Sequence, residues 1–260
     1  MKKRKERADQ LLVEQGLAES REQAKRFIME GIVSVAGTTV RVEKPGQNLS
    51  SDTRLAVQEK AHYVSRGAYK LLTLLEHCEL DVTDCVCLDA GASTGGFTDC
   101  LLKHGARRVY AFDVGHNQLH ESLRADPRVV SREGVNLRNP DPTLIGEPLD
   151  LLCADVSFIS LTLILQPCCQ WLKDSAKLCL LIKPQFEVGP HETVRGVVKD
   201  VEKQKAACAK IITFCQDTLG FTCRACIPSK IKGSKGNQEY MALFERKASL
   251  SLVSETTILP

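Results

Sequence analysis

The sequence predicts a large α/β domain, with a mostly parallel sheet of seven strands and helices on both faces, preceded by a small α+β domain. The length of 260 residues leaves room for both, one of about 60 residues and one of about 200. From residue 85 onward, short apolar runs alternate with amphipathic stretches, as in parallel sheets with crossover helices. Before residue 60 the pattern differs, with two helical stretches followed by short β-branched runs.

The small domain is predicted to span residues 1–60. Apolar residues recur at helical spacing over residues 7–15 and 20–30, each stretch is followed by a glycine, and a capping box opens the second. We expect a hairpin next, in which residues 33–35 pair with Val40 across a tight turn.

The excess of basic residues lies wholly in this small domain. Residues 1–60 carry twelve Lys or Arg against nine Asp or Glu, whereas residues 61–260 carry 23 of each. Arg21, Lys25 and Arg26 lie on the second predicted helix, away from its apolar face. Such a cluster favours a polyanion such as RNA, because neutralising phosphates releases counterions. An ordinary solvated helix face is the alternative.

The composition indicates a folded protein of a reducing compartment. Hydrophobic residues make up 43% and charged residues 26%, which excludes wholesale disorder. The twelve cysteines are scattered through apolar segments, and no apolar run of about 18 residues follows the basic start. We therefore expect a cytoplasmic location, reduced thiols and no membrane association. Cys223-x-x-Cys226 lacks the further ligands of a zinc finger, so we expect no metal.

The α/β domain is predicted at residues 61–247, with a loose tail at 248–260. The expected strands are 86–88, 108–112, 128–131, 149–154, 177–182, 221–227 and 239–246, with helices through 100–102 and over 117–125, 161–172 and 201–219. Polar residues end four of the strands, namely Asp89, Asp113, Asp155 and Lys183. Ligands bind at the C-terminal strand ends of such a sheet, so we expect the site there.

The turn at residues 89–97 reads Asp-Ala-Gly-Ala-Ser-Thr-Gly-Gly-Phe and admits three interpretations. It contains G-x-S-x-G, which would make Ser93 a hydrolase nucleophile, but no later histidine lies at a convincing strand end. A nicotinamide site would need G-x-G-x-x-G, which does not fit. The third interpretation is a Rossmann-like methyltransferase site for S-adenosylmethionine, with Asp113 as the acid that ends the second strand.

The third interpretation predicts which residues hold the cofactor. The three glycines would let backbone approach its amino-acid end, because a Cβ there would occupy its place. Asp113 would accept the ribose hydroxyls, and Asp89 would support the ammonium group or the loop. The expected cofactor-binding residues are Asp89, Gly91, Ser93, Gly95, Gly96, Phe97 and Asp113.

Several segments together resemble one known family. They are HYVSRGAYKL (62–71), LDAGASTGGFTDCLL (88–102), FDVG (112–115), ADVSFIS (154–160), LIKPQFE (181–187) and NQEYMALF (237–244). They resemble the TlyA, or haemolysin A, family of FtsJ-like methyltransferases, from residue 4 to about 247. Residues 8–40 resemble a small RNA-binding module of a ribosomal protein, tyrosyl-tRNA synthetase and pseudouridine synthases. The resemblance implies methylation of a cytidine ribose 2′-hydroxyl in ribosomal RNA, with the large subunit as the first candidate substrate and the small subunit as the second.

The resemblance also implies a catalytic tetrad of Lys70, Asp155, Lys183 and Glu239. A ribose hydroxyl attacks a methyl group well only when a base removes its proton. Lys183 is the candidate base, because desolvation beside a second lysine favours the neutral amine. Asp155 and Glu239 would orient the two ammonium groups, and holding the reacting atoms in line would supply the remaining rate. The alternative for Lys183 and Asp155 is an ordinary buried ion pair.

Further cations are expected to contact RNA, namely Arg66 and the loop residues Lys230, Lys232 and Lys235. A flexible solvated loop is the alternative for residues 229–237. The expected partners are ribosomal subunits, a monomer is favoured, and residues 47–65 are expected to be a hinge. The alternative functions are a membrane-damaging haemolysin and an RNA-binding protein with an inactive methyltransferase fold. No spanning segment supports the first, and the filled tetrad disfavours the second.

Overall fold

The computed structural model describes residues 5–29, 31–57, 62–189, 192–233 and 235–246. The chain divides into two compact units, Met1–His62 and Tyr63–Pro260. The expected tail at 248–260 lies outside the described residues.

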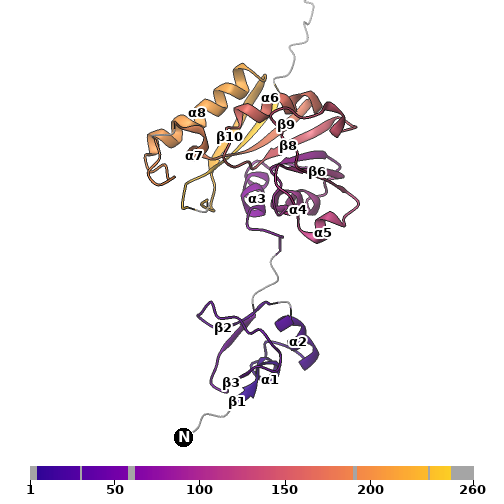
Figure 1. The fold of residues 1–260 in the computed structure, drawn as a ribbon, viewed down its shortest axis with the longest axis vertical. Helices are drawn as coiled ribbons and strands as arrows, with labels where there is room; N and C mark the ends of the chain where they lie inside the picture. Colours follow the sequence, from indigo (N-terminus) through magenta and orange to yellow (C-terminus); the bar gives the residue numbers. More distant parts are fainter. Residues whose placement is uncertain (1–4, 30, 58–61, 190–191, 234, 247–260) are drawn as a thin grey trace, which may run out of the picture. The chain divides into compact units, whose positions relative to one another are not determined.

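The first unit packs two helices against two pairs of short strands (Figure 1). Its helices are α1 (Ala8–Glu14) and α2 (Arg21–Met29). Its antiparallel pairs are β1 (Lys5–Arg7) with β3 (Asn48–Ser50), and β2 (Val33–Val35) with β4 (Leu55–Val57). Leu11, Leu12 and Ile28 of the helices and Val33 and Leu55 of the strands form its small core.

The pairing expected between residues 33–35 and Val40 is confirmed. The Val35 N–H donates to the Val40 carbonyl at 2.8 Å, the Val42 N–H donates to the Val33 carbonyl at 3.0 Å, and Ser34 bridges Arg41. Strand β2 also pairs with β4 on its other side, which was not predicted, and Val42 and Leu55 of its two neighbours are buried. The expected hinge at 47–65 includes β3 and β4, and its residues 58–61 lie outside the described residues.

The second unit contains a seven-stranded sheet in the order β10-β11-β9-β8-β5-β6-β7. The strands are β5 (Val86–Ala90), β6 (Arg108–Asp113), β7 (Val129–Glu133), β8 (Leu149–Ala154), β9 (Leu172–Ile182), β10 (Phe221–Pro228) and β11 (Tyr240–Arg246). Strand β11 is antiparallel to both its neighbours, and the pairs among β5 to β9 are parallel. The predicted mostly parallel α/β sheet is confirmed.

Helices cover both faces of this sheet (Figure 1). On one face α3 (Ala68–His77), α4 (Gly96–Lys103) and α5 (Glu121–Arg124) contribute Leu71, Leu101 and Leu123 to one apolar core. On the other face α6 (Thr162–Cys168) and α8 (Val201–Asp217) contribute Ile164 and Ile211 to a second core. The short elements η1 (Pro142–Leu144), η2 (Cys169–Trp171) and α7 (Pro184–Glu187) complete the unit.

Two predicted helices are shorter than expected. The helix predicted over 117–125 is reduced to α5, because Asn117 is in the left-handed region, with φ of 54°, and His120 is extended and caps the helix by accepting from the Ser122 N–H. The helix predicted over 161–172 ends as α6 at Cys168 and tightens into η2, and β9 begins at Leu172, where it pairs with Leu149.

Candidate active site

The four tetrad residues come from four separate elements of the second unit. Lys70 lies on α3, Asp155 follows β8, Lys183 follows β9 and Glu239 precedes β11. Because β11 runs antiparallel to β9, its beginning lies at the same sheet edge as the ends of the parallel strands. The topology therefore collects these residues at the edge where the sequence predicts a ligand site.

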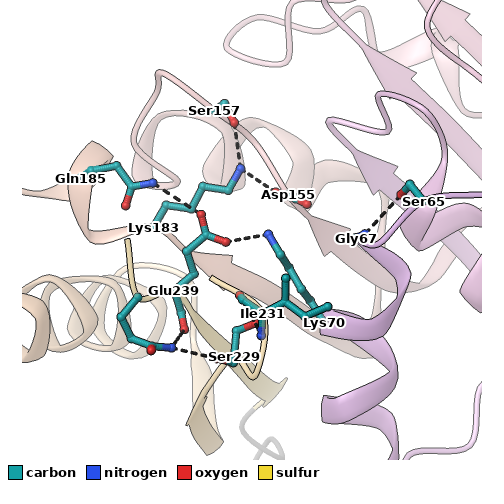
Figure 2. Close-up of polar contacts among 11 residues, drawn as sticks. Ser65, Gly67, Lys70, Asp155, Ser157, Lys183, Gln185, Ser229, Ile231 and Glu239 are labelled. Carbon is teal, nitrogen blue, oxygen red and sulfur yellow. Dashed lines mark hydrogen bonds and ion pairs between the residues drawn. The ribbon is translucent and has the colours of Figure 1, made fainter. Parts of the chain in front are cut away.

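The four residues form two ion pairs (Figure 2). Lys183 Nζ lies 2.6 Å from Asp155 Oδ1 and donates a hydrogen bond of 2.8 Å to Ser157 Oγ. Lys70 Nζ lies 2.6 Å from Glu239 Oε2. All four side chains are at least three-quarters buried, so water screens these pairs less than it would surface pairs.

The glycine turn between β5 and α4 borders a cavity of about 190 Å³. Its lining is Ser65, Gly67, Asp89, Gly91, Ala92, Ser93, Thr94, Gly96, Phe97, Asp155, Ser157 and Lys183. The cavity thus joins the predicted cofactor turn to one of the two ion pairs.

Asp89 is the buried acid of this cavity. Its Oδ2 accepts hydrogen bonds from the backbone N–H and the hydroxyl of Thr98, at 2.9 and 2.7 Å. Its Oδ1 is buried and has no hydrogen-bond partner among the described residues. Burial raises the pKa of Asp89 to about 7, although the Thr98 hydrogen bonds oppose the rise. A buried acceptor without a donor is costly, so this oxygen is suited to a cationic ligand group.

The three glycines of the turn also make room for protein atoms. A Cβ at Gly91 would lie 2.8 Å from the Asp155 carbonyl oxygen, one at Gly95 would collide with Leu123, and one at Gly96 would collide with Ser65. The missing side chains let the turn pack directly against the neighbouring strand end and against α5, and against the loop before α3. Gly91 and Gly96 also line the first cavity, and their contact with the cofactor stays a prediction.

A second cavity, of about 470 Å³, adjoins the first. Gly91, Ser93, Asp155 and Ser157 line both. Asp113 lines the second cavity, where its two carboxylate oxygens accept from the N–H groups of Ser93 and Gly115, at 2.8 and 2.7 Å. These bonds fix the carboxylate and leave each oxygen able to accept another donor.

The residues expected to bind RNA lie in both units. In the first unit, Arg21 pairs with the buried Asp9 at 3.2 Å, whereas Lys25 and Arg26 are exposed on α2. In the second unit, the exposed residues are Arg66, in the loop before α3, and Lys230, Lys232 and Lys235, in the loop before β11. The described residues hold no group of three or more His, Cys, Asp or Glu side chains arranged for a metal ion.

The sequence analysis did not identify three parts of the site. Ser157 binds Lys183, and Gln185 Nε2 donates to Glu239 Oε1 at 3.5 Å (Figure 2). Ser157 follows Asp155 by two positions, and Gln185 follows Lys183 by two positions. This spacing could have indicated both residues in the sequence. The loop 135–138 lines the second cavity, and no pattern in the sequence marks it.

Comparison with known proteins identifies the family. The FtsJ-like methyltransferase family matches residues 63–246, and the S4 domain family matches residues 6–54. The 16S/23S rRNA (cytidine-2′-O)-methyltransferase TlyA of Mycobacterium tuberculosis is 43% identical over 241 residues, 91% of this chain and 88% of its own. The chain belongs to the TlyA family of FtsJ-like methyltransferases. This membership confirms the predicted resemblance and replaces the hydrolase interpretation of Ser93.

Other relatives carry the TlyA family's second name. Hemolysin A of Brachyspira hyodysenteriae is 39% identical over 244 residues, which cover 92% of this chain and 99% of its own. A solved structure from Streptococcus thermophilus, described as a hemolysin, is 42% identical with a TM-score of 0.72 and covers 94% of this chain and 90% of its own. Within the described part of the chain, no helix has the length and apolar character needed to cross a membrane.

Proposed function

We propose that this TlyA-family protein transfers a methyl group from S-adenosylmethionine to the ribose 2′-hydroxyl of a cytidine in ribosomal RNA. The large subunit is the first expected substrate and the small subunit the second. The observation that carries the proposal is the buried ion pair of Asp155 and Lys183 at the cavity edge, because Asp155 lines both cavities and holds Lys183. The printed activity of the Mycobacterium tuberculosis relative supports the choice of ribose and base.

The two adjoining cavities fit S-adenosylmethionine by their donor sets. Asp89 Oδ1 offers a buried, unpaired acceptor for the ammonium group. Asp113 offers fixed carboxylate oxygens for the ribose hydroxyls of the cofactor. When bound, the cofactor supplies an electrophilic methyl group.

Lys183 is the proposed base. As a neutral amine it would accept the proton of the ribose hydroxyl at Nζ, and Asp155 at 2.6 Å would stabilise the ammonium that results. The contact with Ser157 Oγ fixes the position of Nζ. The three side chains together would hold the proton acceptor in one place during the attack.

Lys70 and Glu239 are proposed to stabilise charge. Glu239 holds the Lys70 ammonium at 2.6 Å, and Gln185 contacts the second oxygen of the same carboxylate. A fixed ammonium near the attacking oxygen would stabilise the negative charge that develops as its proton leaves.

The first unit is proposed to add affinity for RNA. Its match to the S4 domain and the exposed Lys25 and Arg26 on α2 support this role, and Arg21 retains donor groups beyond its pair with Asp9. Arg66 lies in the loop before α3, next to Gly67 of the first cavity. A ribosomal substrate implies action in the cytoplasm, and a monomer suffices because all four tetrad residues come from one chain.

The proposal is tested by incubating purified protein with methyl-labelled S-adenosylmethionine and separated ribosomal subunits. We expect label in subunit RNA, and a loss on the order of 100-fold or more in the Lys183→Ala variant. Lys173→Ala is the matched control, because Lys173 lies near the start of β9, at the other end of the strand that Lys183 follows, and pairs with Asp150 at 2.6 Å. Label in neither subunit would refute the activity, and full transfer by Lys183→Ala would remove Lys183 as the base.

A further inference from the structure

Two loops beside the tetrad carry five exposed cations and no carboxylate. Residues 193–199 read TVRGVVK and residues 229–237 read SKIKGSKGN, so neither contains Asp or Glu. The exposed cations are Arg195, Lys199, Lys230, Lys232 and Lys235. We call residues 193–199, 229–233 and 235–237 the two-loop surface.

The acidic residues that flank the first loop are already engaged. Glu192 pairs with Lys203 at 3.4 Å and accepts from the Gly189 N–H at 2.7 Å. Asp200 caps α8 by accepting from the Glu202 N–H. The positive charge of the two-loop surface is therefore available to an external anion.

Asn237 joins the two loops into one unit. Its side chain is buried, with 3% exposed. Oδ1 accepts from the Val198 N–H at 2.9 Å, and Nδ2 donates to the Gly196 carbonyl at 2.8 Å. Its own carbonyl accepts from the Gly233 N–H at 2.9 Å, which closes the second loop. One buried amide thus fixes both loops relative to each other.

The two-loop surface is attached directly to Glu239. The Ser229 N–H donates to the Glu239 carbonyl at 2.8 Å, and Gly233 packs so closely that a Cβ there would collide with Glu239 Oε1. Lys235 reaches across to the first loop, since a Cβ at Gly196 would lie 3.4 Å from its Nζ. The two loops that carry the cations are therefore held next to one tetrad residue.

We propose that the two-loop surface binds the phosphate backbone of RNA next to the nucleotide in the active site. The three lysines of the second loop are already expected to contact RNA, and Arg195 and Lys199 are the additional phosphate contacts. Asn237 is the positioning residue that keeps the two loops together. The inference rests on the proposed function for the identity of the polyanion. Like charges held this close repel one another, and bound phosphates relieve that repulsion while releasing counterions.

The test compares the Arg195→Gln/Lys199→Gln variant with wild type in the full chain. The measurement is fluorescence anisotropy with a short, mixed-sequence single-stranded RNA across a KCl series. We expect affinity at low salt to fall on the order of tenfold and the slope of log affinity against log salt to shrink by about 0.7 for each cation removed, the value for a single strand. Binding of S-adenosylmethionine should not change, since neither residue lines either cavity.

The control variant Arg107→Gln/Arg108→Gln removes the same charge from the beginning of β6, where both arginines pair with Glu147. It should bind the RNA nearly as wild type does. An unchanged affinity and slope in Arg195→Gln/Lys199→Gln, or an equal loss in the control, would overturn the inference.

Asn237→Ala tests the connection between the loops because it keeps every cation. We expect weaker RNA binding with an unchanged salt slope, and wild-type affinity would remove Asn237 as the positioning residue. The two proposals fail separately. A wild type that methylates neither subunit refutes the proposed function, whereas methylation by a wild type whose RNA affinity is insensitive to Arg195 and Lys199 refutes only the two-loop surface.

Discussion

Ile182 pairs with Tyr240 in the antiparallel register of β9 and β11. This pairing sets Lys183, the residue after Ile182, beside Glu239, the residue before Tyr240. A shift of one residue would send the side chains of β11 to the opposite faces of the sheet and place Met241 and Phe244, each fully buried in the core of one face, in the core of the other. The packing of the last strand therefore determines the geometry of the tetrad.

Glu239→Gln should impair turnover without weakening cofactor binding. The change removes the negative charge that holds Lys70 at 2.6 Å, whereas Glu239 lines neither cavity. We expect kcat to fall at least about tenfold, with an unchanged Kd for S-adenosylmethionine by calorimetry. Glu245→Gln on the same strand, where Glu245 pairs with Lys177 and Arg224, should keep wild-type kcat. A parallel loss in both variants would indicate a general effect on β11.

Cofactor binding should depend on pH through Asp89. Burial raises the pKa of Asp89 to about 7, and an ammonium ligand needs the ionised form. Affinity for S-adenosylmethionine should therefore rise between pH 6 and pH 8, by at most about tenfold per pH unit. Calorimetry should find weaker binding by Asp89→Asn with little pH dependence over this range. The same pH dependence in Asp89→Asn would assign it to another group.

The same carboxyl should make the folded state less stable at alkaline pH. The pKa of Asp89 rises on folding from an ordinary value of 3.8 to about 7, so the folded state holds this proton more tightly. Its contribution to the free energy of unfolding is present in full below pH 4 and is lost as the pH rises through 7. Urea titrations of wild type minus Asp89→Asn at pH 5 and pH 8 should show this difference, and no change between the two values would contradict it.

Gly96→Ala should destabilise the second unit. A Cβ at Gly96 would collide with Ser65 Oγ and lie 2.9 Å from the Ala68 backbone nitrogen, so the loop before α3 must move away from α4. We expect a loss of about 1–3 kcal/mol in the free energy of unfolding, measured with urea. At Gly146 a Cβ meets nothing within 4 Å, and Gly146→Ala should leave stability nearly unchanged. Equal stability of the two variants would show that the loop yields without cost.

The sequence predicts the fold and the strand ends of the candidate site correctly where the local apolar pattern agrees with the packing in the structure. The strands around Asp89, Asp113, Asp155 and Lys183 follow apolar runs that are buried in the sheet, so their ends were predictable. The helix expected at 117–125 begins later because Asn117 is left-handed, a conformation that the Glu133 carboxylate supports by accepting from its N–H. The pairing of β2 with β4 depends on the burial of Leu55. The connection through Asn237 depends on two loops about 40 residues apart. Such long-range contacts leave no periodic signal in the chain.

The position of the transferred methyl group tests the proposed function most directly. Ribosomal subunits treated with protein and S-adenosylmethionine are digested to nucleosides and analysed by mass spectrometry, beside the Lys183→Ala and Lys173→Ala variants. We predict 2′-O-methylcytidine from wild type and Lys173→Ala, and almost none from Lys183→Ala. A methyl group on a base, or on the ribose of another nucleoside, would contradict the proposed reaction.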